Sequence, residues 1–185
     1  MMNKVGKILV ANPLMPQTNP FAKSVIYIYQ DDAVQGTNGL VLNKQSNHTL
    51  QELCADHNVI YPEDRSKIYL GGPVNPSAMV LLHSDEWQSK NTAHAGKNLN
   101  ISSDKFMFIK MATGNLPVYW RMHVGMSGWA PGQLDREING VFPYNKSHKW
   151  LTIEADDDII FNYDGEEQWN KALEKCSQTM FDQYF

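Results

Sequence analysis

Apolar and polar positions along the first quarter of the chain predict short β-strands. Residues 7–11 form an apolar run that predicts a buried strand, and Pro13 ends it. The run 24–29 is β-branched and aromatic, and a polar turn at 35–38 separates it from an apolar run at 39–42. Two such runs around a short turn predict an antiparallel hairpin.

Helices are predicted where apolar residues recur every three or four positions. The segment 50–57 shows this spacing, and either Asn47 or Thr49 can cap it. Strands are predicted over 67–70 and 79–83. A second helix is predicted over 104–113, between a cap at Ser102 or Ser103 and Gly114, with a strand over 106–111 as the alternative. Its inward-facing residues are expected to be Phe106, Phe108 and Ile109.

The second half of the chain predicts a strand, a glycine turn and a helix in succession. The strand covers 119–124, the turn 125–129, and the helix 133–139, which follows Pro131 and ends at Gly140. Final strands are predicted over 150–154 and 159–161. A last helix over 166–176 has one apolar face, formed by Trp169, Ala172, Leu173 and Cys176.

The C-terminal tail, residues 180–185, is unusually apolar for a chain end. We expect it to dock on the body of the protein or on a second subunit, which would make a homo-oligomer.

Composition narrows the class of protein. With 185 residues, 42% hydrophobic and 19% charged, the chain predicts one domain over 1–185 with its own core. The net charge of −4 argues against nucleic acid as a partner, because nucleic-acid binders carry a basic face. The small basic group at Lys146, His148 and Lys149 is interpreted as a solvated loop.

The sequence also carries information on the compartment. Cys54 and Cys176 have no metal-ligand or redox spacing, so both are expected to be buried thiols. We find neither an export signal nor a run of about 18 apolar residues. The expectation is a cytoplasmic protein that has no membrane partner.

A serine lies between two glycines in the segment Gly125-Met126-Ser127-Gly128-Trp129. This resembles the nucleophile elbow of hydrolases, but the elbow needs a small residue where this chain has Trp129. We therefore predict that Ser127 is a turn serine rather than a nucleophile.

The segment Gly71-Gly72-Pro73-Val74 is a second glycine turn. It lacks the lysine and hydroxyl residue of a phosphate-binding loop, so a tight backbone turn is favoured over an anion site. Both glycine turns are expected to lie close together and to line one concavity.

Metal and cofactor motifs are not evident. His83 and Glu86 have a suggestive spacing, but a structural histidine is the favoured interpretation. Asp156, Asp157 and Asp158 are interpreted as a solvated turn. The sequence therefore predicts neither a metal site nor a cofactor.

Several motifs follow one another in a recognisable order. They comprise Gly6 to Pro13; Phe21, Ser24 and Val25; Gly36, Gly39 to Val41 and Asn43; Gly71 to Val74; Leu82 and His83; Gly125 to Trp129; and Gly132 to Asp135 with Glu137. In this order they resemble the AlgH/YqgE family of bacterial proteins. The resemblance covers nearly the whole chain, and the GGPV and GxSGWxxGQL motifs are its most specific parts.

The resemblance implies an α+β fold: a single domain with a large, highly twisted or barrel-like, mostly antiparallel β-sheet, smaller sheets and packed helices. It implies no reaction, since no catalytic or cofactor residues are established for the family. The family's label as transcriptional regulators conflicts with the acidity of this chain and with the lack of a helix-turn-helix pattern. The chain departs from the family in the segment Gly140 to Lys149, which predicts a longer loop beside the site.

Three functions remain as hypotheses. The first is a non-catalytic regulatory or adaptor protein that binds a small ligand or a protein at the GGPV and SGW turns. The second is a hydrolase that uses Ser127 or His83, and the third is a DNA-binding regulator. The candidate binding residues are Asn43, Gly71, Gly72, Pro73, His83, Ser127, Gly128, Trp129, Gln133 and Glu137.

Overall fold

A computed structural model describes residues 3–62, 66–145 and 150–184 of the chain. Its strands form one nine-stranded sheet in the order β6-β7-β5-β8-β3-β2-β1-β9, with β4 beside β8. The pairings are antiparallel except for β4 with β8, which is parallel. The predicted α+β fold with a large, mostly antiparallel sheet is confirmed.

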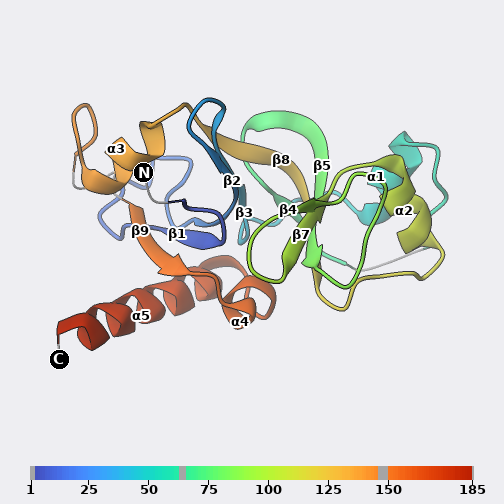
Figure 1. The fold of residues 1–185 in the computed structure, drawn as a ribbon. Helices are drawn as coiled ribbons and strands as arrows, with labels where there is room; N and C mark the ends of the chain where they lie inside the picture. Colours follow the sequence, from blue (N-terminus) through green and yellow to red (C-terminus); the bar gives the residue numbers. More distant parts are fainter. Residues whose placement is uncertain (1–2, 63–65, 146–149, 185) are drawn as a thin grey trace.

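The sheet has two parts, which we call the first and second lobes, at opposite ends of the molecule (Figure 1). The first lobe contains β1 (Lys7–Ala11), β2 (Val25–Asp32), β3 (Gly36–Val41), α3 (Gln133–Asn139), β9 (Trp150–Glu154), α4 (Asp157–Phe161) and α5 (Gly165–Tyr184). The second lobe contains α1 (Leu50–Asp56), β4 (Ile68–Leu70), β5 (Val74–Ser84), β6 (Ala93–His94), β7 (Leu99–Ser102) and α2 (Lys105–Ala112).

Strand β8 (Trp120–Trp129) belongs to both lobes. Its last residues pair with β3, where Gly39 lies opposite Ser127, and its first part pairs with β5, where Leu81 lies opposite Met122. The buried apolar residues form two clusters: one around Tyr27 and Ile28, which also takes in Val80 and Leu82 of β5, and one around Leu81 and Met122 in the second lobe. The shared strand therefore holds two cores in one connected sheet.

Local signals account for several correctly predicted elements. β2 and β3 form the expected hairpin, although they extend into the predicted turn, so that Gly36 lies opposite Asp32. Thr49 caps α1, because its side chain accepts the amide of Glu52 while the Glu52 carboxylate accepts the amide of Thr49. Strands β1 and β9 also match their predicted ranges.

The predicted turn at 125–129 is wrong, because these residues continue β8. Gly125 has a φ of 71°, and the pairing of β5 with β8 shifts register between Val74 and Met79. Such a bulge redirects a strand without ending it. The glycine motif is therefore the point at which β8 passes from one lobe to the other.

Two other predictions about local structure need correction. Residues 159–161 are not a strand but part of α4, because the side chain of Asp156 accepts the amide of Asp158 and caps a helix there. Asp104, rather than a serine, caps α2. The buried residues of α2 include Phe108, as predicted, whereas Phe106 is 53% and Ile109 40% exposed.

Helix α5 packs along β9, β1 and β2 through the predicted apolar face. The indole of Trp169 donates to the carbonyl of Ala11, and Cys176 is buried. The helix continues beyond its predicted end and projects from the body (Figure 1). Met180 and Phe181 are 49% and 64% exposed, and the contact of the tail with a second subunit remains a prediction. No helix in the described ranges is long and apolar enough to span a bilayer.

Candidate functional site

The two glycine motifs lie side by side, as predicted. Val74 pairs with Met126, and a Cβ on Gly71 would overlap the carbonyl of Gly125. A Cβ on Gly72 would overlap the hydroxyl of Ser127. Glycine is required where two backbones approach so closely, and the backbones fill the space in which we expected a concavity.

Ser127 is fully buried, and its hydroxyl donates to the carbonyl of Gly71 at 3.0 Å. His83 lies opposite Trp120, at the other end of β8 from this serine. A nucleophilic serine needs a base within hydrogen-bond reach and an approach for the substrate. The geometry around Ser127 offers neither, which supports the prediction that it is structural.

The predicted residues beyond Ser127 form an aromatic and carboxylate network. One oxygen of Glu137 accepts the indole N–H groups of Trp129, at 3.0 Å, and Trp150, at 2.8 Å. Its other oxygen accepts the amide of Gln133 at 2.9 Å. Trp129 is 6% exposed and its ring stacks on Phe21. These contacts hold α3 against β8 and β9, and they leave little of the network open to a ligand.

The side chain of Asn43 also makes its hydrogen bonds within the protein. Its amide nitrogen donates to the carbonyls of Lys23 and Gly165, both at 2.8 Å, and its oxygen accepts the amide of Val25. The side chain is buried and connects the start of β2 to the start of α5. Asn43 therefore stabilises the first lobe.

His83 takes part in a buried chain of hydroxyl groups in the second lobe. Its Nδ1 lies 2.9 Å from the carbonyl of Ser84, so Nδ1 carries the proton and Nε2 accepts the hydroxyl of Ser102 at 2.9 Å. Ser102 also contacts Thr92 at 2.7 Å. Burial lowers the pKa of His83. The sequence did not predict this pair, since Ser102 lies 19 residues from His83 and carries no motif of its own.

Two buried basic side chains of β8 were also missed. Arg121 is 5% exposed and donates to the carbonyls of Leu42 and Tyr163, which connects β8 to the α4–α5 turn. His123 is fully buried beside Tyr69, and its ring nitrogens make no hydrogen bond of ordinary geometry within the described residues. Burial, assisted by the charge of Arg121, lowers the pKa of His123 to about 3. The alternation of side chains along the predicted strand did not single out these two positions.

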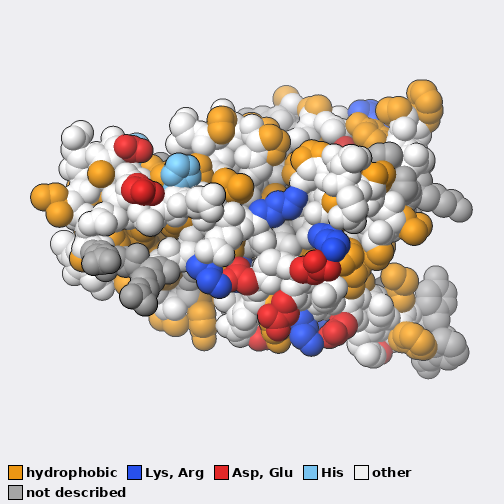
Figure 2. Space-filling model, turned by 180° about the vertical axis from the view of Figure 1, so that it is seen from behind, with side chains coloured by type: hydrophobic (Ala, Val, Ile, Leu, Met, Phe, Trp, Pro, Cys, Tyr) orange, Lys and Arg blue, Asp and Glu red, His pale blue; other side chains and the backbone are white. Residues whose placement is uncertain are grey.

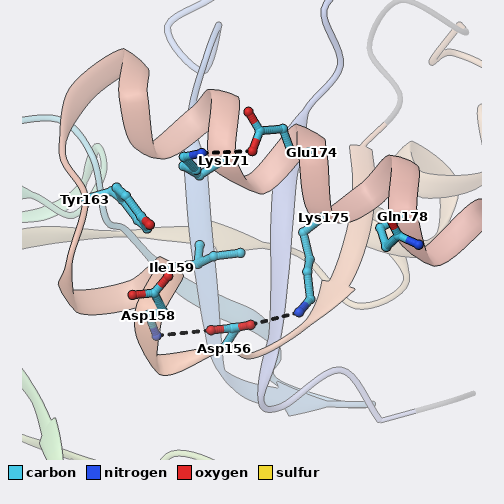
Figure 3. A pocket seen from close by; sticks show the side chains of 8 residues that line it. All are labelled: Asp156, Asp158, Ile159, Tyr163, Lys171, Glu174, Lys175 and Gln178. Atoms are coloured by element: carbon cyan, nitrogen blue, oxygen red, sulfur yellow. Dashed lines mark hydrogen bonds and ion pairs between the residues drawn. The ribbon is translucent and has the colours of Figure 1, made fainter.

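A hollow of about 290 Å³ lies between α4 and α5 (Figure 3). Two ion pairs lie in it, Lys175 with Asp156 and Lys171 with Glu174, both at 3.0 Å, and the carboxylate of Asp158 accepts the side-chain amide of Asn162. Among the described residues, no three side chains of metal-binding type come together. The charged side chains that line the hollow are thus already ion-paired or hydrogen-bonded within the protein.

The motifs leave one feature at the surface, which we call the Val74 strip: Gly72, Pro73, Val74, Met126 and Gly128. Val74 is 39% exposed, Pro73 and Gly128 are exposed, and Met126 is half-buried. A Cβ on Gly128 would lie 3.4 Å from the side chain of Val74, so the members are contiguous. The strip is shallow, apolar and without ionisable groups.

The predicted site residues thus divide into three groups. Gly71, Gly72, Pro73, Ser127 and Gly128 come together around the bulge of β8. Trp129, Gln133 and Glu137 lie next to them, whereas Asn43 and His83 lie elsewhere. The loop 140–149 is described only in part, because residues 146–149 lie outside the described ranges; in the described part Phe142 is 89% exposed.

Comparison with known proteins identifies relatives over nearly the full length. A family model described as AlgH-like matches residues 8–180. A UPF0301 protein from Methylococcus capsulatus is 36% identical over 170 residues, covering 91% of this chain and 88% of that protein. A UPF0301 protein from Francisella philomiragia is 30% identical over 185 residues, covering 96% and 92%.

Solved structures agree with this assignment. The solution structure of the AlgH protein from Pseudomonas aeruginosa is similar with a TM-score of 0.76 and 28% identity, covering 95% of this chain and 92% of that one. A crystal structure from Corynebacterium diphtheriae, at 22% identity and a TM-score of 0.67, shares the fold and covers 93% and 86%. The chain therefore belongs to the AlgH-like family.

Proposed function

We propose that this protein acts as a non-catalytic adaptor that binds another protein through the Val74 strip. One observation carries the proposal: the reactive side chains of the motifs are buried and hydrogen-bonded internally, whereas the strip beside them is exposed. An apolar exposed surface that carries no reactive group favours association over chemistry.

A protein is a better match for the strip than a small molecule. Small ligands bind in concave pockets that bury most of their surface. The closely packed backbones of Gly71 and Gly125 leave no such pocket beneath the strip. Addition of an extended peptide to the β5 edge is also disfavoured, because Pro76 lacks an amide and Asn75 has a φ of 45°. We infer contact through side chains on the face of the strip.

Site-specific photo-crosslinking in the native host tests this proposal. A photoreactive amino acid at Val74 is expected to give a discrete adduct, and the same residue at Val34, 84% exposed in the β2–β3 turn, serves as the matched control. The captured protein is then purified, and its affinity is measured for Val74→Asp and Val34→Asp. Loss of binding in the first variant alone supports the proposal. Equal adducts at both positions, or unchanged affinity for Val74→Asp, would overturn it.

The hydrolase alternative has one observation in its favour, the pairing of Ser102 with His83 at 2.9 Å. Ser102 is 1% exposed and His83 is fully buried, so a substrate would need the site to open.

The DNA-binding alternative is weaker. Helix α5 follows α4 closely, but one face of α5 packs on the sheet. The helix also carries more acidic than basic side chains: Glu166, Glu167, Glu174 and Asp182, compared with Lys171 and Lys175.

A further inference from the structure

A second surface lies on the second lobe, beside α2. Gln88, Ser89, Lys90, Phe106 and Lys110 line an open hollow of about 300 Å³. These residues come from the β5–β6 connection and from one face of α2. They share no member with the Val74 strip, so this surface is independent of the proposed function.

The floor of the hollow is apolar and its rim is positively charged. Phe106 is 53% exposed although it lies on a helix in contact with the core. The ammonium of Lys90 lies 5.4 Å from the centre of the Phe106 ring, and that of Lys110 lies 4.3 Å from the centre of the Trp87 ring. Both lysines thus extend over aromatic rings and keep their charge at the surface.

The charge at this rim is not neutralised within the chain. Among the residues that the structure describes, no ion pair involves Lys90 or Lys110, and the ammonium of Lys110 donates to the carbonyl of Gln88. The Asp104 carboxylate contacts Ser89 at the edge of the hollow, but it is engaged by the amides of Asn91 and Met107. The two lysines thus face no carboxylate among the other residues that line the hollow, on a chain with a net charge of −4.

We propose that this hollow binds an acidic segment of a partner protein, with one apolar side chain of the segment seated against Phe106. The lysine ammonium groups would pair with carboxylates on either side of that anchor. A small concave hollow accommodates a single side chain, which favours a peptide over a flat lipid surface.

Fluorescence anisotropy with designed peptides tests the proposal on the full chain. The probe is a labelled peptide with one phenylalanine between pairs of glutamates. Two matched peptides replace the glutamates by glutamines or the phenylalanine by alanine. We expect the first peptide to bind at least about tenfold more tightly than either control, and its affinity to fall as salt is raised.

Protein variants place the binding at the hollow. Lys90→Gln and Phe106→Ala change exposed side chains and are each expected to weaken binding at least about fivefold. Lys171→Gln removes the same charge from α5 in the first lobe and is expected to leave the affinity unchanged. Equal weakening by Lys171→Gln would show a general charge effect, and no effect of Lys90→Gln and Phe106→Ala would show that the peptide binds elsewhere. Either result would overturn the proposal.

Two further measurements with the same variants distinguish other occupants of the hollow. Vesicles that contain anionic phospholipid are tested by flotation, and self-association is tested by sedimentation velocity. If Lys90→Gln abolishes binding to vesicles or to a second copy while the acidic peptide fails to bind wild-type protein, the proposal is wrong. Peptide binding that is sensitive to both hollow variants confirms it.

Discussion

The hydroxyl of Ser127 shows how a sequence motif can look reactive while the residue is structural. Ser127→Ala removes a buried donor from the Gly71 carbonyl, and we expect a loss of about 1–2 kcal/mol in the free energy of unfolding. Urea denaturation measures this change.

A fluorophosphonate probe gives a second readout for the same residue, and it is expected to label neither Ser127 nor Ser102 in the native protein. Ser102→Ala is the control that separates the two serines. Labelling that disappears in Ser127→Ala would show that this serine is a nucleophile after all.

His123 predicts a pH dependence of stability. Its pKa is about 3 in the folded protein against 6.5 when unfolded, so the unfolded chain binds more protons between these values. Stability from this residue is complete above about pH 6.5 and is lost as the pH falls towards 3. From these two values, we expect a loss of about 2 kcal/mol between pH 7 and pH 5.

Denaturation of His123→Leu at both pH values measures this contribution, which the variant should lack. Arg121 and Tyr69, which lie around the ring of His123, are not substituted in this variant. The exposed His94 supplies the control, since His94→Gln should keep the full pH dependence. An unchanged pH profile for His123→Leu would contradict the assignment.

At the scale of elements, the crossing of β8 over the GGPV segment depends on glycine at some positions only. A Cβ on Gly71 meets backbone, whereas a Cβ on Gly128 lies 3.3 Å from Asn38 and 3.4 Å from Val74. Gly71→Ala should therefore cost about 3 kcal/mol or more, and Gly128→Ala less than about 1 kcal/mol. Equal effects in urea denaturation would show that the close backbone packing is not what the GGPV motif provides.

The same elements show what the sequence could predict. The hairpin of β2 and β3 and the cap of α1 depend on neighbouring residues, so local patterns identified them. The continuation of β8 through residues 125–129 depends on pairing with β3, which lies about 90 residues earlier and leaves no local signal. Glycines that allow a bulge were interpreted as glycines that form a turn.

The candidate site was predicted in part for the same reason. Motif order brought Gly71, Gly72 and Ser127 into one group, and the structure confirms that they are neighbours. Their burial could not be predicted, because it depends on the two backbones packing against each other. The exposure of Phe106 was missed because α2 buries Met107 and Met111 instead, a choice of face that the short helix leaves open.

For the molecule as a whole, we predict no appreciable binding to duplex DNA at physiological salt. The net charge is −4, and acidic and basic side chains are intermixed on the face shown in Figure 2. Non-specific affinity increases with the number of phosphates that a basic surface neutralises. Anisotropy of a labelled duplex measures this, and a steep salt-dependent rise at low micromolar protein would restore the DNA-binding hypothesis.

The sharing of β8 by both lobes has a consequence for how the chain can be divided. A cut between α2 and β8 gives an N-terminal piece without the strand that β3, β4 and β5 all require as a neighbour. Its counterpart keeps β8 and β9 but lacks β1, the partner of β9. Neither piece holds a complete core, so each should be unfolded alone, and mixing them should restore the native sheet by fragment complementation.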